Sequence, residues 1–146
     1  MTHAQKAAEY FCEGYNCSQS VVLAYCDDLK LDKELALKIS SSFGGGMGRL
    51  REVCGAVSGM FFVAGILHGY TDPSDKAVKD KHYKLIQELA EKFQKAHSTY
   101  LCKDLLKVAG KQSPISEERT PEYYKTRPCV RFVITACEIL DEKFFN

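Results

Sequence analysis

The feature that most constrains the fold is an uncharged run from Val53 to Leu67, flanked by Glu52 and His68. A helix needs about 20 apolar residues to cross a bilayer, so this run is too short to span a membrane. Drawn as a helix, the run is apolar around its whole circumference, which is typical of a helix with neighbours on every side. We therefore expect a buried central helix from about Arg51 to His68 and no membrane insertion.

The rest of the chain also has a helical pattern, because apolar residues recur at helical spacing and strand-like alternation is missing. Thr2, Asn16 and Asp32 can each cap a helix, and Gln19 can complete a capping box with Asn16. The pattern predicts an all-α fold, a single domain over residues 1–146, with about six helices around the glycine-rich central one. The expected helices cover residues 2–13, 16–29, 32–43, 51–68, 72–97, 99–110 and 128–144, with a glycine loop at 44–48 and a short turn after Pro121.

Composition and charge exclude several classes of function. The 146 residues are 45% hydrophobic and 27% charged, as in an ordinary globular protein. Lysine and arginine total 20 against 19 acidic residues, so no bulk positive charge is available to bind nucleic acid. The chain enters a helical pattern directly after Met1, without the features of an export signal. We expect a cytoplasmic protein that does not bind nucleic acid.

Seven cysteines and no tryptophan are the unusual part of the composition. No pair has the Cys-x-x-Cys spacing of a zinc ribbon or a thioredoxin-like site. Four cysteines lie near expected helix N-termini, where unpaired N–H groups favour a thiolate; they are Cys17, Cys54, Cys102 and Cys129. The remaining three are expected to be small buried apolar residues; they are Cys12, Cys26 and Cys137.

The same residues carry a family resemblance. Asn16-Cys17, the glycine loop, the segment Cys54-Gly55-Ala56-Val57-Ser58-Gly59, and then Cys102 and Cys129 resemble the C_GCAxxG_C_C family, which is named for a suspected redox activity. The resemblance covers roughly residues 10–137. It implies a small helical protein of bacterial or archaeal type in which Cys17, Cys54, Cys102 and Cys129 are the shared cysteines.

Four thiolates from four helices suit either an iron–sulfur cluster or a structural zinc ion. The glycine loop favours the cluster, because backbone N–H groups can donate to its sulfurs where glycine allows close approach. We expect Gly44, Gly45, Gly46 and Gly48 to contact this cofactor. Nearby arginines, at positions 49, 51, 127 and 131, could offset the charge of an anionic cluster.

We therefore expect electron transfer or redox sensing through an iron–sulfur cluster bound by Cys17, Cys54, Cys102 and Cys129, with a redox partner protein. One alternative is a thiol/disulfide oxidoreductase that uses two of these cysteines, with Cys17 as the favoured nucleophile. The other is an interaction module that zinc stabilises. Whether the protein is an oxidoreductase and whether it forms a homodimer stay open at this point.

Overall fold

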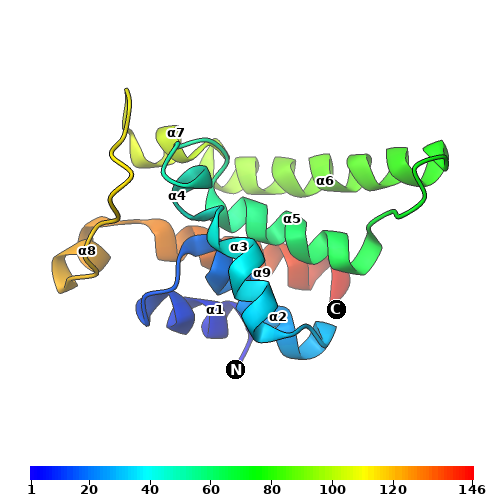
Figure 1. Ribbon diagram of the computed structural model, residues 1–146, viewed down its shortest axis with the longest axis horizontal. Helices are drawn as coiled ribbons and strands as arrows, with labels where there is room; N and C mark the ends of the chain where they lie inside the picture. The colour runs from blue at the N-terminus through cyan, green and yellow to red at the C-terminus, as the bar shows by residue number, and fades with distance from the viewer.

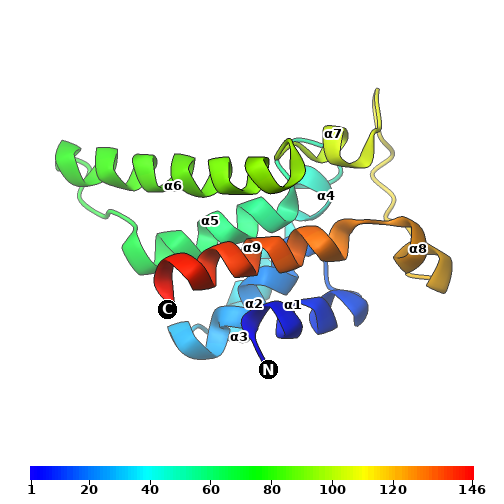
Figure 2. The ribbon, with the colours of Figure 1, turned by 180° about the vertical axis from the view of Figure 1, so that it is seen from behind.

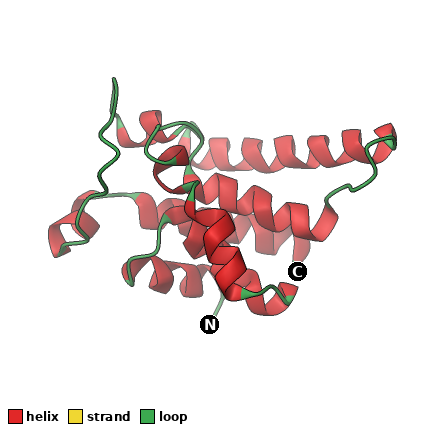
Figure 3. Cartoon of the chain, viewed as in Figure 1, coloured by secondary structure: helices red, strands yellow, loops and turns green.

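Helices account for all the regular secondary structure of the chain, so the all-α prediction is confirmed (Figure 1, Figure 3). The structure, a computed structural model, describes residues 1–146. Its nine helical elements are α1 (His3–Cys12), α2 (Cys17–Leu29), α3 (Lys33–Ser41), α4 (Gly44–Met47), α5 (Gly55–His68), α6 (Lys76–His97), α7 (Cys102–Leu106), α8 (Pro121–Thr126) and α9 (Cys129–Phe144).

The first three helices begin where their capping residues predict. The side chains of Thr2, Asn16 and Asp32 each accept a hydrogen bond from a backbone N–H in the first turn. Asn16 and Gln19 form the expected capping box. These caps satisfy backbone donors that have no partner inside the helix, which is why short local sequences define the helix starts.

Helix α5 lies at the centre of the bundle, as its apolar circumference predicts. It packs against α2, α6 and α9. Five of its 14 residues belong to one cluster of 21 buried side chains that also includes residues of α1, α2, α6 and α9. A Cβ atom added at Gly59 would lie 3.0 Å from the carbonyl oxygen of Ser18, so this glycine allows the backbones of α5 and α2 to approach closely.

The central helix begins later than the sequence predicts. It starts at Gly55 rather than near Arg51, because Val53 pairs with Leu101 in an isolated antiparallel bridge and Arg51 has a left-handed backbone conformation with φ +61°. The preceding glycine loop contains the short turn α4, inside which Gly45 and Gly46 have left-handed conformations. A long-range contact therefore sets the start of α5, and pattern alone could not locate it.

The expected break after α6 is present, because Ser98 takes a left-handed conformation with φ +74° directly after His97. Helix α7 is shorter than expected and stops at Leu106, since Lys107 is also left-handed. Helix α9 begins at Cys129, so Pro128 is its cap rather than its first residue.

Several short elements meet at one end of the bundle. Figures 1 and 2 show α4 and α7 next to each other at the end where α5 and α9 begin. The loop between α7 and α8, residues 107–120, crosses the same end, and we call it the strap. No helix combines the length and the apolar character that crossing a membrane requires.

Candidate functional site

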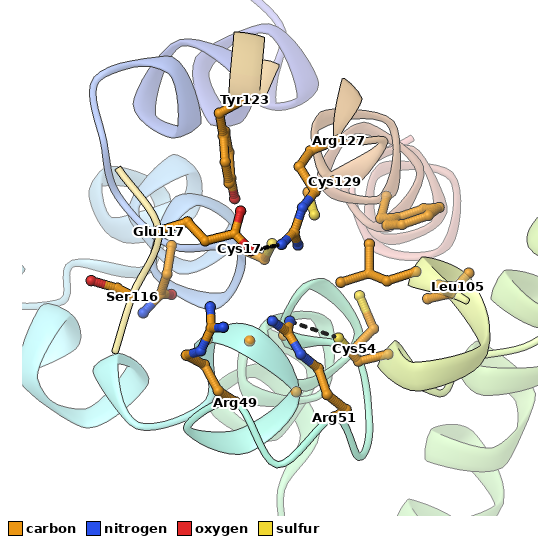
Figure 4. Close-up of a pocket in the computed structure, with 18 of the residues that line it drawn as sticks. Cys17, Arg49, Arg51, Cys54, Leu105, Ser116, Glu117, Tyr123, Arg127 and Cys129 are labelled. Atoms are coloured by element: carbon orange, nitrogen blue, oxygen red, sulfur yellow. Dashed lines mark hydrogen bonds and ion pairs between the residues drawn. The ribbon is translucent and has the colours of Figure 1, made fainter. Parts of the chain in front are cut away.

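A pocket of about 190 Å³ at this end is lined by four cysteines from four different helices. They are the four that the sequence singled out: Cys17, Cys54, Cys102 and Cys129. Figure 4 labels three of them, Cys17, Cys54 and Cys129. Each of these side chains is buried, with between 4% and 9% of its surface exposed. Cys17, Cys102 and Cys129 are the first residues of their helices, and Cys54 is the cap of α5. The expected positions at helix N-termini are therefore confirmed.

Two of these cysteines are aligned by backbone pairing. Beside the bridge between Val53 and Leu101, the N–H of Cys54 donates to the carbonyl oxygen of Tyr100 at 2.9 Å. The N–H of Cys102 donates to the carbonyl oxygen of Glu52 at 2.6 Å. The bridge brings the segment before α5 next to the segment before α7, so two thiols 48 positions apart in sequence reach the same pocket.

Cys17 and Cys129 both line the pocket, and their thiols affect each other's ionisation. Hydrogen bonding from Cys17 and the nearby Arg127 guanidinium lower the pKa of Cys129 to about 7, although burial opposes the shift. The interaction with Cys129 and burial raise the pKa of Cys17 well above its ordinary value. The two thiols therefore form an asymmetric pair, in which Cys129 ionises more readily than Cys17.

At the other two pocket cysteines, burial has a larger effect on the thiol pKa than the helix N-terminus has. It raises the pKa of Cys54 to about 12, even though the backbone N–H groups of Ala56 and Val57 favour the thiolate. Burial also raises the pKa of Cys102, while the Arg51 guanidinium acts in the opposite direction. A position at a helix N-terminus is therefore not sufficient to make these two thiols acidic.

The glycine loop forms one wall of the pocket. Gly44, Gly45 and Gly46 line it, whereas Gly48 lies outside the lining. A Cβ atom added at Gly46 would lie 2.6 Å from the Cβ atom of Cys102, so the backbone packs directly against this cysteine. Three of the four loop glycines therefore line the pocket that the cysteines share, and their contact with a cofactor stays a prediction.

Arginine side chains form another part of the wall. Arg49, Arg51, Arg119 and Arg127 line the pocket, and Arg131 does not. Figure 4 shows the side chains of Arg49, Arg51 and Arg127 directed into the pocket. Only 5% of Arg51 is exposed, and its Nη1 atom donates to the Sγ atom of Cys102 at 3.5 Å. The pocket is therefore both thiol-rich and strongly basic.

The sequence pattern did not identify the contribution of the strap. Glu117 in the strap forms an ion pair with Arg127 across the pocket. Arg119 anchors the strap: its guanidinium carbon lies 4.3 Å from the ring centroid of Phe11, and its Nη atoms donate to the carbonyl oxygens of Phe11 and Tyr15. Neither residue is part of a recognisable motif, and only their polar character within a loop could have drawn attention to them.

The remaining cysteines lie apart from the pocket. Cys26 and Cys137 are buried in the core, as expected. The expectation for Cys12 was wrong, because this residue is exposed. Ala7 and Phe11 define the buried face of α1, and Cys12, one position after Phe11, is rotated away from that face.

The side chains do not gather around a single point. No three His, Cys, Asp or Glu side chains are grouped so that they could hold one metal ion. The four cysteines instead surround a cavity. Four thiols are a soft donor set.

The protein is an all-α bundle with a cysteine-based centre. The N-terminal ends of four helices place four buried thiols in one basic pocket. Comparison with protein families identifies the family: the model of the family "Putative redox-active protein (C_GCAxxG_C_C)" matches residues 15–143. The chain belongs to this family, as its cysteine and glycine motifs suggested. No curated protein and no solved structure matches the chain.

Proposed function

We propose that the protein is an electron-transfer or redox-sensing protein in which Cys17, Cys54, Cys102 and Cys129 hold an iron–sulfur cluster. The observation that carries this proposal is the convergence of these four buried thiols on one pocket from four helices. A redox partner protein and a cytoplasmic location are parts of the same proposal.

The residues of the pocket fit such a cofactor in three ways. Four cysteine thiolates are the usual ligand set of iron–sulfur clusters. The backbone at Gly46 lies against Cys102, where backbone N–H groups can donate to sulfur. Arg51 supplies a buried positive charge beside the Cys102 sulfur. When bound, the cluster supplies a centre that changes charge by one electron.

The arrangement favours a cluster over a single zinc ion. Four cysteines that bind one zinc ion hold their sulfurs about 2.3 Å from a common point. Here the four cysteines line a pocket of about 190 Å³, and no three potential ligands are grouped for one ion.

The test is purification without oxygen, followed by an absorption spectrum and by iron, sulfide and zinc assays on the same sample. The proposal predicts a brown protein that contains iron and acid-labile sulfide. A colourless protein with one zinc ion per chain and no sulfide would reject the cluster in favour of the zinc-stabilised module.

A second candidate function is thiol/disulfide oxidoreduction by Cys17 and Cys129. Two observations favour it: both thiols line the same pocket, and the pKa of Cys129 is lowered to about 7, so that Cys129 ionises more readily than Cys17. In this reaction the two sulfurs form a disulfide, and the disulfide of an oxidised partner is reduced to two thiols. The lower pKa favours Cys129 as the nucleophile, where the sequence alone favoured Cys17.

The two candidates differ in a mass measurement. Metal-free protein treated with an oxidised dithiol should lose two hydrogen masses and regain them on reduction if Cys17 and Cys129 cycle. The Cys17→Ala variant cannot form this disulfide and should keep its mass. Cys26→Ala is the matched control outside the pocket and should lose the two hydrogen masses.

A further inference from the structure

The four-cysteine pocket holds more positive charge than its own residues balance. Four arginines line it, and Glu117 is its one acidic residue. Arg119 is occupied elsewhere, because its Nη atoms donate to carbonyl oxygens of Phe11 and Tyr15. The guanidinium groups of Arg49, Arg51 and Arg127 remain directed into the pocket (Figure 4).

These three arginines have unused hydrogen-bond donors. Arg51 is 95% buried, and its Nε atom has no hydrogen-bond partner. Arg49 uses its Nε atom to donate to the carbonyl oxygen of Ser113 at 2.7 Å, which leaves its two terminal nitrogens. A buried donor without a partner is unfavourable, and a ligand that accepts its hydrogen bond relieves that cost.

We propose that Arg49, Arg51 and Arg127 form a binding site for a small oxyanion, a phosphate or carboxylate group, next to the cysteines. Guanidinium groups bind such oxygens through paired, charge-assisted hydrogen bonds. The pocket reaches from the four cysteines to Ser116 and Glu117 of the strap, so the oxyanion would lie on the strap side of the sulfurs. The site therefore takes an anionic small molecule, and this inference does not depend on which redox chemistry the cysteines perform.

Glu117 occupies part of this site in the structure. Its carboxylate pairs with Arg127, and its side chain is 44% exposed at the edge of the pocket. It belongs to the strap rather than to a helix of the bundle. Glu117 is therefore an internal carboxylate that an external oxyanion must displace from Arg127.

A variant of Arg49 distinguishes oxyanion binding from charge compensation of the thiols. Arg51 donates to the sulfur of Cys102 and Arg127 lowers the pKa of Cys129, so their loss would also affect a bound cluster or the thiolate. Arg49 makes its one hydrogen bond to the backbone of the strap. A change at Arg49 thus tests oxyanion binding with the least effect on the cysteines.

The experiment is isothermal titration of inorganic phosphate and, separately, of succinate into the protein purified without oxygen, at low ionic strength. Arg49→Gln should weaken binding about tenfold, the effect of one charge-assisted hydrogen bond. Glu117→Gln should strengthen binding several-fold, because it removes the competing carboxylate. Arg131→Gln and Glu118→Gln change the same charges outside the pocket and should leave the affinity unchanged.

The absorption spectrum and iron content of each variant report the cluster independently of anion binding. Tighter binding of phosphate than of succinate would assign the site to a phosphate group, and the reverse order would assign it to a carboxylate. The absence of binding in both the wild type and Glu117→Gln would overturn the proposal. Equal weakening by Arg49→Gln and Arg131→Gln would also overturn it, because net charge would then explain the effect.

Discussion

The Nη1 atom of Arg51 lies 3.5 Å from the Sγ atom of Cys102. The arginine follows the glycine loop, and the cysteine starts α7, 51 residues later. Both side chains are buried, so the guanidinium acts on this sulfur with little screening by solvent. The contact links the basic wall of the pocket to the thiols.

Arg51→Gln should lower the midpoint potential of the proposed cluster. The guanidinium favours the reduced, more negative state, and its loss removes a charge-assisted hydrogen bond of about 1.5 kcal/mol, or about 60 mV for one electron. Redox titration followed by absorption measures the shift. Arg131→Gln, outside the pocket, is the control, and an equal shift in both variants would remove Arg51 from this role.

Gly46→Ala and Gly65→Ala should change stability in opposite directions. At Gly46 the φ angle is +67°, and a Cβ atom would lie 2.6 Å from that of Cys102, so alanine should cost about 2 kcal/mol and reduce iron content. At Gly65, inside α5, a Cβ atom would meet nothing within 4 Å, so alanine should add about 0.5–1 kcal/mol. Urea unfolding measures both. A Gly46→Ala variant as stable as the wild type, with full iron content, would make the loop a simple connector.

The reactivity of Cys129 in metal-free, reduced protein should follow a midpoint near pH 7. The hydrogen bond from Cys17 lowers this pKa to about 7, so alkylation by iodoacetamide should speed up as the pH rises through 7. Cys17→Ala removes the donor, and the midpoint should then move upward toward 9. A midpoint that is the same in both proteins would contradict the asymmetric pair.

The lowered pKa of Cys129 also predicts how the free energy of unfolding changes with pH. Its folded pKa of about 7 lies below the ordinary value of 9.0, so its contribution is present above pH 9 and is lost as the pH falls through 7. Metal-free wild type should therefore gain stability between pH 7 and 9 relative to Cys129→Ala. Urea unfolding at the two pH values measures this difference, and an equal pH dependence in the two proteins would contradict it.

Arg119→Ala should release the strap from the bundle. The variant loses two hydrogen bonds to backbone carbonyl oxygens and the contact with the Phe11 ring, at a cost of about 2 kcal/mol. Hydrogen exchange of residues 111–118 should become faster, while that of α5 stays slow. Lys125→Ala on α8 is the control, and unchanged exchange in the strap would contradict the anchoring role.

Local sequence was enough to predict most of the helices. Caps such as Thr2 and Asn16 act within one turn, so a few adjacent residues contain the required information. The predicted start of α5 was wrong, because the actual start depends on the pairing of Val53 with Leu101. That contact joins segments that are far apart in sequence, and periodicity does not register it.

The candidate site was only partly predictable for the same reason. The position of the four cysteines at helix starts followed from capping and glycine signals, together with a family resemblance. Their pKa values did not follow, because burial at Cys54 outweighs the helix N-terminus. The roles of Glu117 and Arg119 also depend on how the strap folds back over the pocket.

The iron and acid-labile sulfide content of single serine variants tests most directly whether four particular cysteines hold an iron–sulfur cluster. Cys17→Ser, Cys54→Ser, Cys102→Ser and Cys129→Ser should each lose most of both, because serine is a harder and usually neutral ligand. Cys12→Ser, Cys26→Ser and Cys137→Ser lie outside the pocket and should keep the content of the wild type. Wild-type protein without iron, or full iron content in Cys102→Ser combined with loss in Cys26→Ser, would contradict the claim.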